Sequence, residues 1–116
     1  MSAESATARR AGVIAVHSLD HFVFSVPDLD VAARFYDDFG LEVRRRDDRL
    51  HLHTAGHSHR WGTVLHGAGP KRLQYLAFGA YAEDFDALQK RLAQLGASAS
   101  PAHLQAESSG LWFRDP

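Results

Sequence analysis

The pattern of apolar and polar positions in the first half of the chain predicts a β-α-β-β-β unit. Apolar, mostly β-favouring residues are dense over residues 19–26, which predicts a strand. Pro27 ends this strand because proline cannot donate a hydrogen bond to a strand ladder. Three short strands are expected later, separated by Asp47-Asp48 and by a loop at 55–59. They cover residues 41–44, 49–54 and 61–66.

A helix is expected between the first and second of these strands. Apolar residues recur every four positions there, a spacing typical of one helical face. They are Val31, Phe35 and Phe39. Asp28 or Asp30 can cap the start of the helix by accepting hydrogen bonds from free backbone N–H groups. Gly40 stands where a left-handed C-cap is expected.

The second half of the chain repeats the pattern after Gly67-Ala68-Gly69-Pro70, a sequence typical of a linker. Residues 73–80 predict a strand. Residues 83–95 predict the clearest helix of the chain, and Gly96 is expected to end it. The apolar residues that carry its helical spacing are Phe85, Leu88, Leu92 and Leu95. The remaining expected strands are a weak one at 103–106 and a firmer one at 111–114.

The two halves are copies of one unit. Residues 19–24 align with residues 73–78, so that Tyr75 takes the position of His21. A repeat of this size indicates two supersecondary units packed together. The expected organisation is a flexible arm at 1–16 and one domain at 17–116, with a first module at 19–66, a linker at 67–72 and a second module at 73–116 that lacks its last strand.

Composition narrows the classes of function. The 116 residues are 45% hydrophobic and 23% charged, which predicts one ordered domain. Cysteine is absent, which excludes disulfide scaffolds and thiol nucleophiles, and a net charge of −1 argues against nucleic acid and anionic membranes as partners. Arg9-Arg10 precedes only four apolar residues, too few for an export signal, so a cytoplasmic location is expected. The unusual count is eight histidines.

Four segments of the chain resemble the vicinal oxygen chelate superfamily, which includes glyoxalase I, bleomycin-resistance proteins and extradiol ring-cleavage dioxygenases. They are residues 19–28, 33–41, 73–79 with 83–85, and 110–116, the last being most similar to the N-terminal half of extradiol enzymes. The resemblance implies an α+β fold in which two β-α-β-β-β modules form a U-shaped mixed sheet. Helices would cover its convex face, and the concave groove would hold a metal and a substrate. Alternation along the first strand then directs Phe22, Phe24 and Val26 towards a helix. The alternate residues, His21, Val23 and Ser25, point into the groove.

The resemblance also implies a metal site with one His from the first strand of each module and a Glu from the final strand. His21 stands at the first ligand position and Tyr75 at the second, while the third lies beyond Pro116. The family uses Fe(II) or another divalent metal, but two imidazoles and a carboxylate are needed, so we expect no metal bound by this chain alone. His21 is then either a groove-lining, hydrogen-bonded histidine or a ligand whose site a partner chain or the missing strand completes.

A second group of histidines offers a rival set of metal ligands. His51 and His53 share one face of a predicted strand, because side chains alternate along it, and His57 and His59 follow on a Gly-Ser loop. These residues are candidates for adventitious metal binding or for the mouth of the groove. The residues expected to line the groove are Tyr75, Trp61, His51 and His53.

Three functional hypotheses follow from the resemblance. The first is the supporting N-terminal domain of an extradiol, catechol-type dioxygenase, inactive by itself and without catalytic residues of its own. The second is a stand-alone protein of the bleomycin-resistance type that binds a small aromatic or cationic ligand, and the third is a dimeric, metal-dependent glyoxalase-like isomerase. An incomplete second module leaves strand ladder groups unpaired, so we expect a homodimer or pairing with a second domain.

Overall fold

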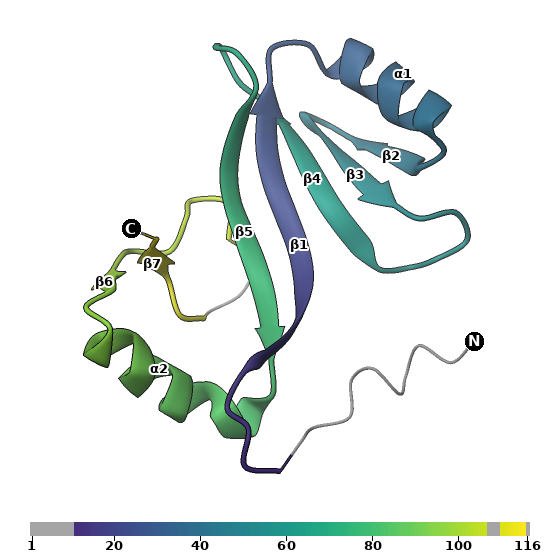
Figure 1. The fold of residues 1–116 in the computed structure, drawn as a ribbon. Coiled ribbons are helices and arrows are strands. Elements are labelled where there is room, and N and C mark those ends of the chain that lie inside the picture. Colours follow the sequence, from purple (N-terminus) through teal and green to yellow (C-terminus); the bar gives the residue numbers. More distant parts are fainter. Residues whose placement is uncertain (1–10, 107–109, 116) are drawn as a thin grey trace. The chain divides into compact units, whose positions relative to one another are not determined.

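The computed structural model describes residues 11–106 and 110–115, which fall into two compact units (Figure 1). One unit is Leu19–Phe78, and the other holds the described residues before and after it. Most of the predicted N-terminal arm, residues 1–10, lies outside the described residues. The elements in chain order are β1 (Val16–Val26), α1 (Leu29–Phe39), β2 (Glu42–Arg46), β3 (Arg49–His53), β4 (Arg60–His66), β5 (Arg72–Ala80), the 3-10 turn η2 (Ala82–Asp84), α2 (Phe85–Gln94), β6 (Ser98–Ala99) and β7 (Phe113–Arg114).

A five-stranded mixed sheet forms the Leu19–Phe78 unit, with the strand order β2-β3-β4-β1-β5 (Figure 1). β1 pairs with β4 in parallel, whereas β2, β3 and β4 pair antiparallel. A parallel pair needs a crossover connection, and α1 with the β2–β3 hairpin supplies it. The predicted α+β class and the β-α-β-β-β order of the first half are therefore confirmed, with the three short strands within two residues of their expected bounds.

The hydrophobic core of this unit lies between α1 and the sheet. Period-two alternation places the apolar residues of β1, β3 and β4 on the face that α1 covers. The core residues are Phe24, Val26, Leu29, Ala32, Leu50, Leu52 and Val64. The predicted direction of Phe24 and Val26 towards a helix is confirmed.

Both ends of α1 form as the sequence predicts. The Asp28 carboxylate accepts hydrogen bonds from the backbone N–H groups of Asp30 and Val31 at 2.9 and 3.1 Å, which identifies Asp28 as the N-cap. Gly40 ends the helix with φ = 111°, a left-handed conformation that glycine adopts without a Cβ clash.

The face that α1 turns to the core is not the apolar stripe that predicts the helix. Leu29 and Ala32 are buried, and Ala33 and Tyr36 pack against the same core. These four positions have the i, i+3, i+4, i+7 spacing of a single helical face. The stripe of Val31, Phe35 and Phe39 lies beside that face and is exposed.

The second unit contains α2, whose expected first turn is instead the 3-10 turn η2. Gly96 follows the helix with φ = 76°, and the Ala97 N–H donates back to the Leu92 carbonyl at 3.0 Å, so the predicted glycine terminus is confirmed. Neither α1 nor α2 is long and apolar enough to cross a membrane, and the same holds for every helix within residues 11–106 and 110–115.

One predicted strand of the second unit is wrong. Residues 103–106 form a turn, in which the Ala106 N–H donates to the His103 carbonyl at 2.9 Å and the Gln105 N–H donates to His103 Nδ1 at 3.0 Å. These local bonds occupy the groups that a strand ladder would need. The strand β6 lies earlier, before Pro101, and pairs antiparallel with β7 through Ser98 and Arg114 and through Ala99 and Phe113.

Candidate functional site

His21 is held in one orientation on β1 by its neighbour Asp20. The imidazole donates from Nδ1 to Asp20 Oδ2 at 2.7 Å, and the side chain remains partly accessible. A carboxylate can only accept, so Nδ1 carries the proton and, in the neutral ring, the lone pair is on Nε2. The pair therefore presents a basic nitrogen that can accept a proton or bind a ligand.

Tyr75 of β5 contacts the imidazole of His21. Its ring meets the His21 imidazole edge-on, with 5.7 Å between the ring centroids and 82° between the planes. The repeat in the sequence assigns equivalent positions to these two residues, and in the sheet they are in contact. A phenol thus stands beside His21 where the family pattern implies a second imidazole.

His59, on the loop before β4, contacts both the backbone of Asp20 and the side chain of Trp61. Its Nε2 lies 2.8 Å from the backbone carbonyl oxygen of Asp20, which can only accept, so Nε2 donates. Its ring meets the indole of Trp61 edge-on at 4.5 Å and 75°. We call Asp20, His21, His59, Trp61 and Tyr75 the imidazole–aromatic cluster. It joins residues from β1, β4, β5 and a loop.

Asp20 is absent from the site that the sequence predicts, and His59 was expected with His51, His53 and His57 as a rival metal ligand or at the mouth of the groove rather than beside Asp20. Asp20 precedes His21 in a strand, where alternation sends neighbouring side chains to opposite faces, so a contact between them is not expected. His59 meets Asp20 from 39 residues away, across a loop. The Asp-His dipeptide was the only local signal available for this pairing.

His51 and His53 lie elsewhere on the sheet, on β3, two strands away from β1. His51 accepts a hydrogen bond at Nε2 from the Arg60 guanidinium, with 3.0 Å between the two nitrogens. His53 is only 5% exposed, and its Nδ1 has no hydrogen-bond partner among the described residues. The two histidines therefore do not join the imidazole–aromatic cluster.

Glu42 stands opposite His53 in the β2–β3 ladder and is already paired with an arginine. Arg44 donates to its carboxylate from Nε at 2.6 Å, and the Gly56 N–H donates at 3.4 Å. These hydrogen bonds, the one from Arg44 first, lower the pKa of Glu42. The carboxylate opposite His53 in the ladder is thus held as an ion-pair partner of Arg44.

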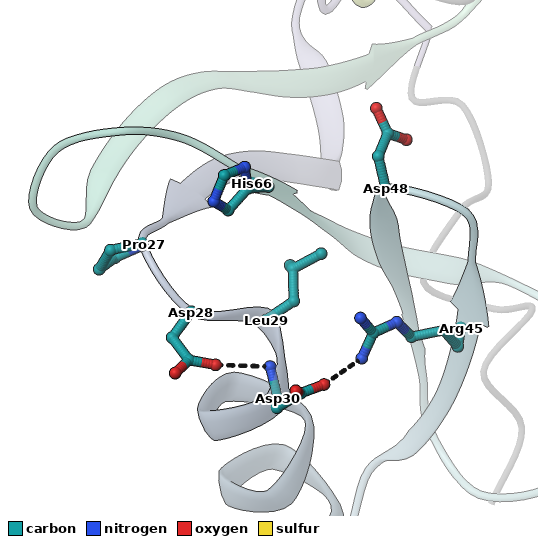
Figure 2. A pocket seen from close by; sticks show the side chains of 7 residues that line it. All are labelled: Pro27, Asp28, Leu29, Asp30, Arg45, Asp48 and His66. Carbon is teal, nitrogen blue, oxygen red and sulfur yellow. Dashed lines mark hydrogen bonds and ion pairs between the residues drawn. The ribbon is translucent and has the colours of Figure 1, made fainter.

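A shallow hollow of about 360 Å³ lies at the start of α1 (Figure 2). Its charges are matched within the chain, because Asp30 pairs with Arg45 at 2.7 Å and Asp28 caps the helix. The hydrogen bond from Arg45 lowers the pKa of Asp30. The lining residues are Pro27, Asp28, Leu29, Asp30, Arg45, Asp48 and His66. This set contains no nucleophile with an adjacent base, so we assign it no chemistry.

The residues present do not fit the divalent metal that the fold family implies. Within the described ranges, no three His, Asp or Glu side chains are grouped so that they could hold a metal ion. His21 has the tautomer of a ligand, but its aromatic neighbour is Tyr75 rather than a histidine. A mononuclear site needs further neutral imidazole or carboxylate donors on the same face. No reaction step is therefore derived through a metal.

The comparison with known proteins agrees with this fold. A family model of the Glyoxalase/Bleomycin resistance protein/Dioxygenase superfamily matches residues 18–116. The chain belongs to this superfamily. The resemblance inferred from its segments is thus confirmed.

Among curated proteins, this superfamily member is similar to metapyrocatechase 2 of Cupriavidus necator, with 41% identity over 102 residues. The match takes in 88% of this chain but only 31% of that protein.

Two solved structures share the fold of this chain. A Mn(II)-bound glyoxalase from Novosphingobium aromaticivorans matches with a TM-score of 0.63 and 26% identity, over 85% of this chain and 35% of that one. A variant of homoprotocatechuate 2,3-dioxygenase from B. fuscum matches with a TM-score of 0.62 and 21% identity, over 81% and 27%. The chain therefore spans about a third of the length of these relatives.

Proposed function

We propose that this chain is the N-terminal supporting domain of an extradiol, catechol-type dioxygenase and binds no catalytic metal of its own. The observation that carries the proposal is the similarity to metapyrocatechase 2, which takes in most of this chain and less than a third of that protein. A segment of that proportion corresponds to one domain of a larger enzyme.

The imidazole–aromatic cluster supports a structural role within such a domain. His21 and Asp20 belong to β1, Trp61 to β4 and Tyr75 to β5, and their contacts tie these neighbouring strands together. At the two positions where the family pattern implies imidazoles, the cluster holds the imidazole of His21 and the phenol of Tyr75. In this proposal the domain supplies a rigid sheet, and the metal and the catechol bind to another domain.

The test starts with metal content and activity of the purified 116-residue chain. After incubation with Fe(II) under anaerobic conditions and removal of free metal, we expect no stoichiometric iron and no ring cleavage of catechol. The intact mass of the product of the native gene should then be about two to three times that of this chain, as expected for tandem domains. Stoichiometric iron together with catechol cleavage by the chain alone would refute the proposal.

A second candidate function is the binding of a small aromatic ligand by the chain itself. It is favoured by Trp61, a residue that is 39% exposed although its indole packs edge-on against His59 in the cluster. An accessible aromatic surface of this kind can stack on a ring. Titration with catechol should then quench tryptophan fluorescence with saturation.

The chain offers its own control for that titration, because it holds only two tryptophans, Trp61 and Trp112. Saturable quenching should be lost in Trp61→Phe and kept in Trp112→Phe. Quenching that is linear in ligand concentration in both variants would show collisions alone and would exclude this second function.

A further inference from the structure

Helix α1 carries a continuous apolar ridge on the exposed face beside the one that meets the core. Val31, Phe35 and Phe39 are 53%, 60% and 73% exposed. The rings of Phe35 and Phe39 stack at 6.2 Å with 12° between their planes, so the ridge has one ordered surface. Large apolar groups that are contiguous and exposed mark interaction surfaces more often than scattered ones do.

The spacing of the ridge matches a common mode of helix packing. Residues four positions apart form a ridge inclined to the helix axis, and two such ridges interdigitate when helices cross at about 50°. This is the most frequent class of helix–helix contact in globular proteins. A second helix with the same ridge is therefore a suitable partner for Val31, Phe35 and Phe39, and a second copy of the chain supplies one.

The charges beside the ridge determine the direction of that partner. With 3.6 residues per turn, Arg34 and Asp38 lie along the side of the ridge away from the core. Both are exposed, and within the described part of the chain neither takes part in a hydrogen bond or an ion pair. A parallel second copy would place like charges together. An antiparallel copy places each Arg34 beside the other copy's Asp38.

We propose that the ridge of α1 binds the same ridge of a second copy of this chain in antiparallel orientation. Phe35 lies at the centre, and Arg34 of each copy faces Asp38 of the other. This surface is separate from the imidazole–aromatic cluster and from any strand edge, and it does not rest on the proposed dioxygenase role. Such a two-fold contact is self-complementary, as closed dimers require.

The size of the ridge makes this a weak dimer. With roughly 200 Å² for a whole phenylalanine side chain, the exposed parts of the ridge amount to about 350 Å² per copy and about 700 Å² for the pair. Stable interfaces bury about 1,200–2,000 Å² in total, so the expected Kd lies at about 10⁻⁵ to 10⁻³ M.

Sedimentation velocity of the 116-residue chain from about 1 µM to about 1 mM tests the proposal over that range of Kd. We expect a monomer at the low end and a dimer at the high end. Phe35→Glu should weaken dimerisation at least about tenfold, because it places two carboxylates at the centre of the contact. Leu104→Glu is the matched control, since Leu104 is 97% exposed in a turn outside α1, and it should leave dimerisation unchanged.

The orientation is tested by exchanging the charges. Arg34→Asp alone should weaken the dimer, and Arg34→Asp combined with Asp38→Arg should restore it, because the exchanged pair is again complementary only in the antiparallel arrangement. A chain that stays monomeric up to the highest concentration overturns the proposal. So does dimerisation that Phe35→Glu leaves intact, or a double variant no stronger than the single one. Circular dichroism of each variant identifies any that fails to fold, and Phe39→Glu then replaces Phe35→Glu.

Discussion

The ring of Tyr75 meets the imidazole of His21 edge-on at 5.7 Å, and these two residues align when residues 19–24 are compared with residues 73–78. The contact joins β1 to β5, which are neighbours in the sheet. It sets a phenol beside His21, whose Nδ1 donates to Asp20. The pair thus contributes to the cohesion of the sheet.

Removing the Tyr75 ring should destabilise the sheet. Tyr75→Ala deletes a partly buried aromatic ring and its edge contact with His21, and we expect a loss of about 1–3 kcal/mol in the free energy of unfolding. Tyr75→Phe keeps the ring and should lose less. Urea denaturation followed by circular dichroism measures both, and equal losses in the two variants would show that the ring contact contributes nothing.

Gly62 on β4 should tolerate no side chain. A Cβ at this position would lie 2.7 Å from Cε1 of Phe22 and 3.3 Å from Cδ1 of Leu52. Gly62→Ala should therefore cost about 1–3 kcal/mol of stability through overpacking.

Gly69 is the control for that substitution, because a Cβ there would meet nothing within 4 Å. Gly69→Ala should change stability by no more than about 0.5 kcal/mol. Phe22→Leu makes room near Gly62, so adding it to Gly62→Ala should recover part of the loss. Equal thermal stability of Gly62→Ala and the parent chain would contradict the close packing of Phe22 on Gly62.

The cap of α1 should contribute measurably to stability. Asp28→Ala removes the acceptor of the Asp30 and Val31 N–H groups, and a loss of about 1 kcal/mol is expected. Asp28→Ser restores a capping oxygen and should recover most of it. Chemical denaturation separates the three proteins, and a serine variant as unstable as the alanine variant would argue against capping as the cause.

The ion pair of Asp30 and Arg45 should make stability depend on pH in acid. The hydrogen bond and the positive charge of Arg45 lower the pKa of Asp30 in the folded chain. A carboxyl whose pKa is lowered on folding contributes stability above its ordinary pKa and loses that contribution as the pH falls through the lowered value. Arg45→Met should raise the pKa of Asp30. The variant should be less stable than the parent chain at neutral pH, and this difference in the free energy of unfolding should shrink as the solution becomes more acidic.

Carboxyl titration by NMR measures that shift directly. Arg46→Met is the control, because Arg46 donates to the backbone carbonyl of Arg45 rather than to a carboxylate. An Asp30 pKa that is unchanged in Arg45→Met, or that moves as far in Arg46→Met, would contradict the assignment of Arg45 as the cause.

Much of the fold follows from signals that lie within a few residues of one another. Pro27, the Asp28 cap and Gly40 define the ends of β1 and α1, and the structure confirms all three. Such signals work because a cap or a left-handed glycine acts on the backbone beside it. The strand expected at 103–106 failed for the same kind of reason, since His103 closes a local turn that the apolar pattern does not reveal.

The apolar stripe of α1 shows what local sequence signals cannot predict, namely which face of a helix is buried. Its four-residue spacing is correct evidence for a helix, but a spacing cannot say which of two adjacent helical faces meets the sheet. Leu29, Ala32 and Tyr36 face the core, whereas Phe35 and Phe39 do not. The small side chain of Ala32 on the core face allows the helix to pack closely on the sheet.

The chain's own order of residues was enough to predict its helices, its main strands and its superfamily, and to align His21 with Tyr75. Tertiary structure alone decided that these two rings touch, that His59 reaches Asp20 from 39 residues away, and that Val31, Phe35 and Phe39 remain exposed. The physical reason is the distance along the sequence over which each interaction acts. Backbone preferences act between neighbours in sequence, whereas side-chain contacts and burial depend on which distant segments pack together.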